Sequence, residues 1–123
     1  MRIEEMQQRA VAVRGQFAAF EQATYGKQWT NEDLTLGLVK DVGDLAEIVQ
    51  RMEGKRPARA TTARADLEHE ISDCLWSLLV LADQYEVDVA SAFTATMDGL
   101  EASLSATSGD LEQSATPGPT PLD

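Results

Sequence analysis

The sequence predicts an all-α protein built as a four-helix bundle. Apolar residues recur at helical spacing in four segments, turn and capping residues separate these segments, and no segment shows the alternation of a β-strand. A chain of 123 residues suits one domain. We expect a helical domain over residues 1–106, followed by a disordered tail over residues 107–123.

The first two helices are predicted from an apolar stripe and from capping signals. The first covers about residues 3–24, and its heptad-like stripe requires helical partners on one face. Thr30 is the expected N-cap of the second helix, with Asp33 at the capping-box position. The second helix is expected to end at Gly54, because glycine commonly terminates helices. Its predicted core stripe consists of Leu38, Val42, Leu45, Val49 and Met52.

The third and fourth helices follow a basic loop. Thr61 or Thr62 is expected to cap the third helix, whose centre over residues 74–82 is apolar on nearly every side. Such a helix indicates a subunit interface, so we expect a homo-oligomer, with a dimer favoured over a tetramer. Asp88 is the expected cap of the fourth helix. From Thr107 onward Pro, Ser, Thr and Gly predominate, which predicts disorder.

Composition and charge exclude several kinds of partner. The formal net charge of −11 argues against a nucleic-acid polymer held through its phosphates. No apolar run is long enough to span a bilayer, so no membrane partner is expected. The single cysteine cannot form an internal disulfide, which suggests a reduced, cytoplasmic protein. All Lys and Arg residues lie at or before Arg64, so an anionic ligand must use the first half of the chain, a partner subunit or bound cations.

Two acidic pairs stand beside apolar stripes on successive helices. Asp41 and Asp44 lie three residues apart in the second helix, and Glu70 and Asp73 lie three residues apart in the third. Residues at this spacing project from one side of a helix. If the stripes pack antiparallel, four carboxylates converge, and a divalent cation such as Mg²⁺ or Mn²⁺ would relieve their repulsion. The alternative is that all four are surface acids beside a core.

These residues resemble the motifs of the MazG-like family of all-α nucleoside-triphosphate pyrophosphohydrolases. The family motif is E-x-x-E followed, after a variable gap, by E-x-x-D. Residues 41–44 read Asp-Val-Gly-Asp, residues 70–73 read Glu-Ile-Ser-Asp, and residues 45–69 form the gap. The resemblance implies Mg²⁺-dependent hydrolysis of a (d)NTP to (d)NMP and pyrophosphate, with all four acids as metal ligands and catalytic residues.

The chain departs from the family pattern in ways that keep a second function open. Both acids of the first half-motif are Asp, and Lys40 stands where the family usually has Glu. Lys40 is expected either to contact a substrate phosphate or to weaken metal binding. The fourth helix also lacks the phosphate-binding cations of many members. The alternative is therefore a catalytically degenerate member that acts as a nucleotide-binding or helical interaction module.

Further candidates for substrate binding lie outside the acidic motifs. Lys55 and Arg56 are expected to reach phosphates from the loop, or else to form a solvated turn. Trp76, three residues after Asp73, is expected to stack on a base or to belong to the core. Trp29 is expected to cover the pocket or to act as a hydrophobic staple for the second helix.

Overall fold

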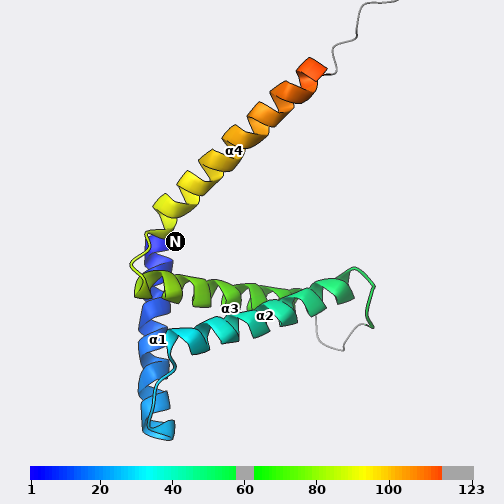
Figure 1. The fold of residues 1–123 in the computed structure, drawn as a ribbon. Coiled ribbons are helices and arrows are strands. Elements are labelled where there is room, and N and C mark those ends of the chain that lie inside the picture. Colours follow the sequence, from blue (N-terminus) through cyan, green and yellow to red (C-terminus); the bar gives the residue numbers. More distant parts are fainter. Residues whose placement is uncertain (58–62, 115–123) are drawn as a thin grey trace, which may run out of the picture. The chain divides into compact units, whose positions relative to one another are not determined.

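The computed structural model describes residues 1–57 and 63–114. In these ranges the chain forms four helices and no strand, so the predicted all-α class is confirmed (Figure 1). The helices are α1 (Ile3–Tyr25), α2 (Asn31–Met52), α3 (Ala63–Gln84) and α4 (Val89–Ser114). The chain divides into two compact units, Met1–Val89 and Ala90–Asp123.

The N-terminal signal of α2 acts as the sequence predicted, whereas α2 ends at Met52, two residues before the expected Gly54. α1 ends at Tyr25, and the following Gly26 has a φ of 72°, in the left-handed region that glycine adopts without strain. Thr30 and Asp33 form a complete capping box at the start of α2. The Asp33 N–H donates to Thr30 Oγ1 at 3.2 Å, and the Thr30 N–H donates to Asp33 Oδ2 at 2.9 Å. The loop from Tyr25 to Asn31 is therefore fixed at both ends.

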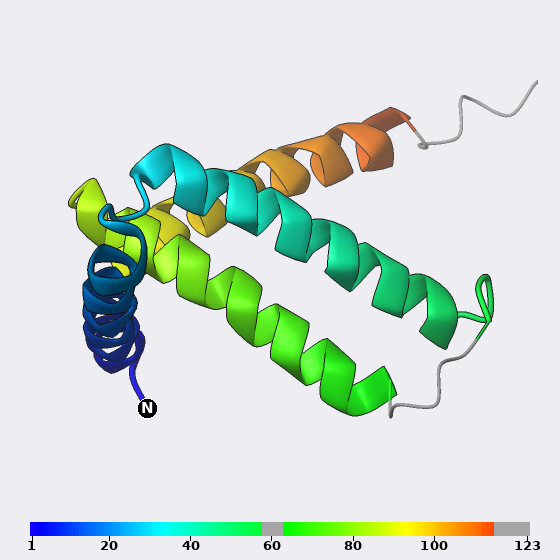
Figure 2. The same cartoon turned by 90° about the horizontal axis from the view of Figure 1, so that it is seen from below.

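In the first unit, α2 and α3 run antiparallel side by side, and α1 crosses them where α2 begins and α3 ends (Figures 1 and 2). The core lies at this crossing and contains Ala10, Leu34, Leu79 and Val80. Val80 is fully buried. Because the core is at one end of the α2–α3 pair, the remaining length of the seam between the two helices is available for polar groups.

The structure corrects the predicted core stripe of α2 and shows which residues of α3 are buried. The side chains of Val42, Val49, Met52, Ile71 and Leu78 are exposed. Leu34 and Ile48 are the buried residues of α2, and Cys74, Ser77, Leu79 and Val80 are those of α3. Both helices carry apolar residues on more than one face, and the face that α2 and α3 turn toward each other includes the acidic positions.

α4 is a 26-residue helix whose described residues include none that is buried. It exposes a stripe formed by Phe93, Leu100, Leu104 and Leu111. The helix continues to Ser114, so the structure differs from the predicted disorder over residues 107–114. The side chain of Thr107 donates to the carbonyl oxygen of Ser103 at 2.9 Å within this segment.

Some predicted features lie outside the described residues, namely the candidate caps Thr61 and Thr62 and the tail over residues 115–123. Among the helices that the structure describes, none combines the length and apolar character that crossing a membrane requires.

Candidate functional site

The predicted carboxylates meet along the seam between α2 and α3. Asp41, Asp44 and Glu70 each offer an oxygen, and these three atoms lie within 4.8 Å of one another. A second group with the same spacing consists of His69, Glu70 and Asp73, so Glu70 belongs to both. All four carboxylate residues are partly buried. The antiparallel packing of two helices with acids at i and i+3 therefore produces a continuous acidic cluster.

The negative charge of this acidic cluster is poorly compensated by the protein. Glu70 Oε2 is buried and has no hydrogen-bond partner among the described residues. Burial, followed by the charges of Asp44, Asp73 and Asp41, raises the pKa of Glu70. Burial and the nearby Asp73 carboxylate likewise raise the pKa of Asp41. A buried carboxylate oxygen without a donor fits a divalent cation with oxygen ligands, so the residues present suit the metal that the motif implies.

Two basic residues contact acids at or near the cluster. Lys40 Nζ lies 2.9 Å from Asp44 Oδ2, and this contact raises the pKa of Lys40. His69 Nε2 lies 3.1 Å from Asp73 Oδ2, with the imidazole largely exposed. Lys40 therefore lies at the cluster as predicted, but it is paired with one of the candidate metal ligands.

Other candidates from the sequence lie away from this cluster. On α2, Glu47 forms an ion pair with Arg51. Arg56 Nη1 lies 4.0 Å from the same Glu47 carboxylate, and Lys55 is exposed in the loop after α2. The structure thus joins Arg56 to Glu47 and does not place Lys55 or Arg56 on the cleft described next.

A cleft of about 710 Å³ extends from the acidic cluster along the crossing of the three helices. Its polar end includes Lys40, Asp41, Ser72 and Asp73. The rest of the lining is mainly aromatic and aliphatic, namely Val13, Phe17, Phe20, Tyr25, Trp29, Leu34 and Trp76, together with Arg14, Glu21, Gly37 and Ser77. An apolar cleft that ends in a few converging polar groups is the usual form of a small-molecule site.

Trp76 packs against the core, which is one of the two roles considered for it, and it also lines the cleft. Its Nε1–H donates to the carbonyl oxygen of Ala10 at 3.1 Å. Its ring meets Phe17 edge to face, with centroids 5.9 Å apart. The indole is therefore fixed on two sides, while part of the ring stays accessible from the cleft.

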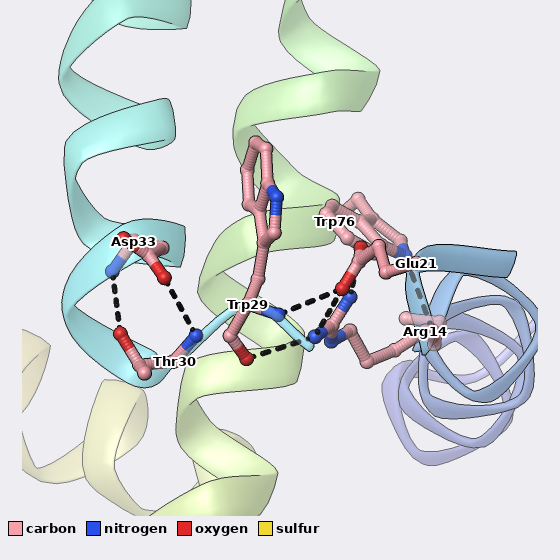
Figure 3. Close-up of polar contacts among 7 residues, drawn as sticks. Arg14, Glu21, Trp29, Thr30, Asp33 and Trp76 are labelled. Atoms are coloured by element: carbon pink, nitrogen blue, oxygen red, sulfur yellow. Dashed lines mark hydrogen bonds and ion pairs between the residues drawn. The ribbon is translucent and has the colours of Figure 1, made fainter. Parts of the chain in front are cut away.

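Trp29 lies opposite, in the loop before α2, and its backbone is held by two charged residues of α1 (Figure 3). The Trp29 N–H donates to Glu21 Oε1 at 2.8 Å, and its carbonyl oxygen accepts from Arg14 Nη2 at 3.0 Å. Arg14 also donates to both Glu21 oxygens, at 2.8 and 3.2 Å. The Arg14 guanidinium, which outweighs the effect of burial, lowers the pKa of Glu21.

Sequence reasoning missed Arg14 and Glu21. Charged residues on an amphipathic helix are normally solvated, and the loop that they hold lies beyond the helix end. The available signal was their spacing of seven residues, which places opposite charges on one face two turns apart, next to the apolar stripe.

Comparison with known proteins identifies the family. Over 69 residues the chain is 39% identical to dCTP pyrophosphatase 1 of Bos taurus, an alignment that covers 54% of this chain and 41% of that relative. The chain thus spans about two fifths of the relative's length. No solved structure matches the chain. Residues 29–102, which contain both acidic half-motifs, match the MazG nucleotide pyrophosphohydrolase domain. The chain therefore belongs to the MazG family of nucleotide pyrophosphohydrolase domains.

Proposed function

We propose that this protein is a divalent-metal-dependent pyrophosphohydrolase, which converts a (d)NTP and water to (d)NMP and pyrophosphate. The observation that carries the proposal is the junction of the acidic cluster with the aromatic cleft. Asp41 and Asp73 line the polar end of the cleft, whereas Trp29 and Trp76 line its apolar part. A nucleotide has the matching polarity, with an anionic triphosphate at one end and an aromatic base at the other.

The acidic cluster would hold the cation. Asp41, Asp44, Glu70 and Asp73 are the proposed ligands, with Mg²⁺ as the first candidate and Mn²⁺ as the second, because both prefer oxygen donors. When bound, a divalent cation neutralises phosphate charge and lowers the pKa of a coordinated water. The buried, unpartnered oxygen of Glu70 supports this assignment.

The remaining residues would bind and orient the substrate. Trp29 and Trp76 would contact the base, and their separate anchors would keep their rings in place when the cleft is empty. Lys40 would contact a phosphate oxygen while it stays close to Asp44. In the reaction, water attacks the α-phosphorus, the bond to the α–β bridging oxygen breaks, and pyrophosphate leaves with that oxygen. Holding the α-phosphate in line with the water is the contribution expected of the cleft.

Release of pyrophosphate from a panel of nucleotides, with Mg²⁺ or Mn²⁺, tests this function. dCTP is the first substrate to try, because the bovine relative is named for it. Turnover that requires the metal and is lost in Asp73→Asn would support the proposal. Absence of turnover with every (d)NTP and both metals would contradict it.

The ion pair between Lys40 and Asp44 favours a second candidate function. A cation 2.9 Å from one of the proposed ligands competes with a metal for that carboxylate. A member that binds nucleotide without hydrolysing it would have this arrangement. Equilibrium binding of a nucleotide without pyrophosphate release would support this alternative over the enzyme.

We also propose that the protein is a homo-oligomer, with a dimer favoured. On the first unit, Val42, Val49, Ile71 and Leu78 are exposed around the acidic seam, and α4 separately exposes its own apolar stripe. Covering such surfaces with a second copy would remove apolar area from water. Sedimentation equilibrium tests this, and a monomer at micromolar concentration would contradict it.

A further inference from the structure

Burying Arg14 and Glu21 at their contact with Trp29 costs desolvation free energy that the stability of α1 does not require. Both charged side chains are at most one tenth exposed. Desolvating an ion pair often cancels its attraction, so an apolar pair at these two positions would stabilise the helix equally well. Selection of charges here therefore needs a reason beyond the stability of α1.

That reason is the backbone of Trp29. This residue lies between the end of α1 and the start of α2, where no helix supplies partners for its N–H and C=O groups. Glu21 accepts from the N–H and Arg14 donates to the carbonyl oxygen, so a donor and an acceptor are both satisfied by one buried pair. An apolar pair could satisfy neither.

Fixing this backbone also determines where the indole lies. The Trp29 ring rests against α2 at Gly37, where an added Cβ would lie 3.4 Å from ring atom Cζ3. The ring is half exposed and faces the cleft. The backbone contacts from α1 and the ring contact with α2 together define one orientation of the indole.

We infer that Arg14 and Glu21 form a positioning clamp, which holds Trp29 as a preformed wall of the cleft and thereby sets the affinity for the base end of the nucleotide. This inference rests on the proposed function, and it assigns the two residues a role through Trp29. A preformed wall reduces the ordering cost of binding. Loss of the clamp should therefore weaken nucleotide binding more than it slows the chemical step at the acidic cluster.

Steady-state kinetics with dCTP and Mg²⁺ test the clamp in Glu21→Gln, with Glu5→Gln as the matched control. Glu5 is an exposed acid on the same helix. We expect KM to rise about tenfold in Glu21→Gln, because the neutral amide no longer pairs with the Arg14 charge and its bond to the Trp29 N–H loses charge assistance, with kcat within about threefold of the parent. The control should change neither. A fall in kcat with unchanged KM would overturn the inference.

Fluorescence tests the clamp without nucleotide. The sequence has two tryptophans, so Trp76→Phe leaves Trp29 as the sole indole reporter. Adding Glu21→Gln to this background should shift the Trp29 emission to the red and lower its anisotropy, at unchanged helix content by circular dichroism. An unchanged spectrum would overturn the clamp. If the parent protein hydrolyses no nucleotide, the proposed function fails, and this comparison still decides whether the clamp holds Trp29.

A charge swap separates the clamp from simple stabilisation of α1. In Arg14→Glu with Glu21→Arg the ion pair across the helix is restored, but position 21 then presents donors to the Trp29 N–H. We expect the swap to recover thermal stability without recovering the parental KM or Trp29 spectrum. Recovery of all three would show that the pair serves α1 alone and would overturn the inference.

Discussion

Asp41 on α2 and Glu70 on α3 approach so closely that an oxygen of each lies within 4.8 Å of the other. Two carboxylates at this separation repel each other, and burial, the largest cause of the raised pKa of each, adds to the cost of their charged forms. The helices nevertheless bring them together, because α2 and α3 pack antiparallel along the seam that carries both residues. The acidic cluster is the cation site that we propose, and its properties can be tested apart from catalysis.

Mg²⁺ should stabilise the protein against heat even without nucleotide. A ligand that binds only the folded state contributes about 2.7 kcal/mol at a hundredfold excess over its Kd. Glu70→Gln should lose most of this stabilisation, and its pyrophosphate release should fall by at least about 100-fold. Melting temperature against Mg²⁺ concentration measures the first effect. An equal rise in melting temperature in the parent and in Glu70→Gln would show that Mg²⁺ binds elsewhere. The control Glu5→Gln should respond to Mg²⁺ as the parent does.

The metal-free protein should show a pH dependence with a definite sign. Folding raises the pKa values of Asp41 and Glu70. Their contribution to the free energy of unfolding is therefore greatest when the pH is below their ordinary pKa values, and it falls as the pH rises through their pKa values in the folded protein. Glu70→Gln should therefore gain stability relative to the parent as the pH rises above about 4.5, the ordinary pKa of a glutamate. Urea unfolding in a chelator measures the difference. A free energy of unfolding of Glu70→Gln that falls relative to the parent as the pH rises would contradict the raised pKa of Glu70.

Lys40→Gln should bind metal more tightly and nucleotide more weakly. Removing the ammonium frees Asp44 and lowers the local positive charge, and it also deletes the proposed phosphate contact. We expect the Kd for Mn²⁺ to fall several-fold and the KM for the nucleotide to rise by about fivefold to tenfold. Isothermal titration and steady-state kinetics measure the two changes. Lys55→Gln, in the loop after α2, removes the same charge at a different position and serves as the control. If it changed the Kd for Mn²⁺ and the KM equally, the cause would be net charge and not the position of Lys40.

Trp76→Phe should lower both the free energy of unfolding and the affinity for the nucleotide, for two different reasons. The smaller ring keeps a contact with Phe17 but loses the hydrogen bond to Ala10, which is worth about 1 kcal/mol. The loss of stacking area in the cleft should raise the Kd for the nucleotide. Urea unfolding and equilibrium binding to Asp73→Asn, with and without Trp76→Phe, measure the two effects. Unchanged nucleotide affinity would remove Trp76 from the base site.

Helix positions were predictable because their signals are local. The Thr30–Asp33 capping box and the Gly26 and Gly54 turns depend on residues only a few positions apart. The convergence of the acids was predicted only on the condition that the two helices pack antiparallel, because i, i+3 spacing fixes the side of each helix and not its partner.

The exact packing faces were not predictable from periodicity. Val42 and Leu45 seemed equivalent members of one stripe, yet the first is 49% exposed and the second is partly buried. A broad apolar surface allows several rotations of a helix about its axis, and only the partner helices select one. The pairing of Arg14 with Glu21 was signalled by their spacing, but their contact with Trp29 was not predictable, because a loop backbone carries no side-chain pattern.

Glu70, Asp73 and Trp76 stand on one uninterrupted helix, so α3 would set the spacing between the two ends of the nucleotide in the proposed site. Trp76 is six positions after Glu70, a rise of about 9 Å along the axis at 1.5 Å per residue. Inserting a single alanine between Asp73 and Trp76 would advance the indole by only about 1.5 Å but would turn it by about 100°. The axial spacing between the acid and the ring is thus set by the rise per residue of the helix, and insertions or deletions can change it only by whole residues.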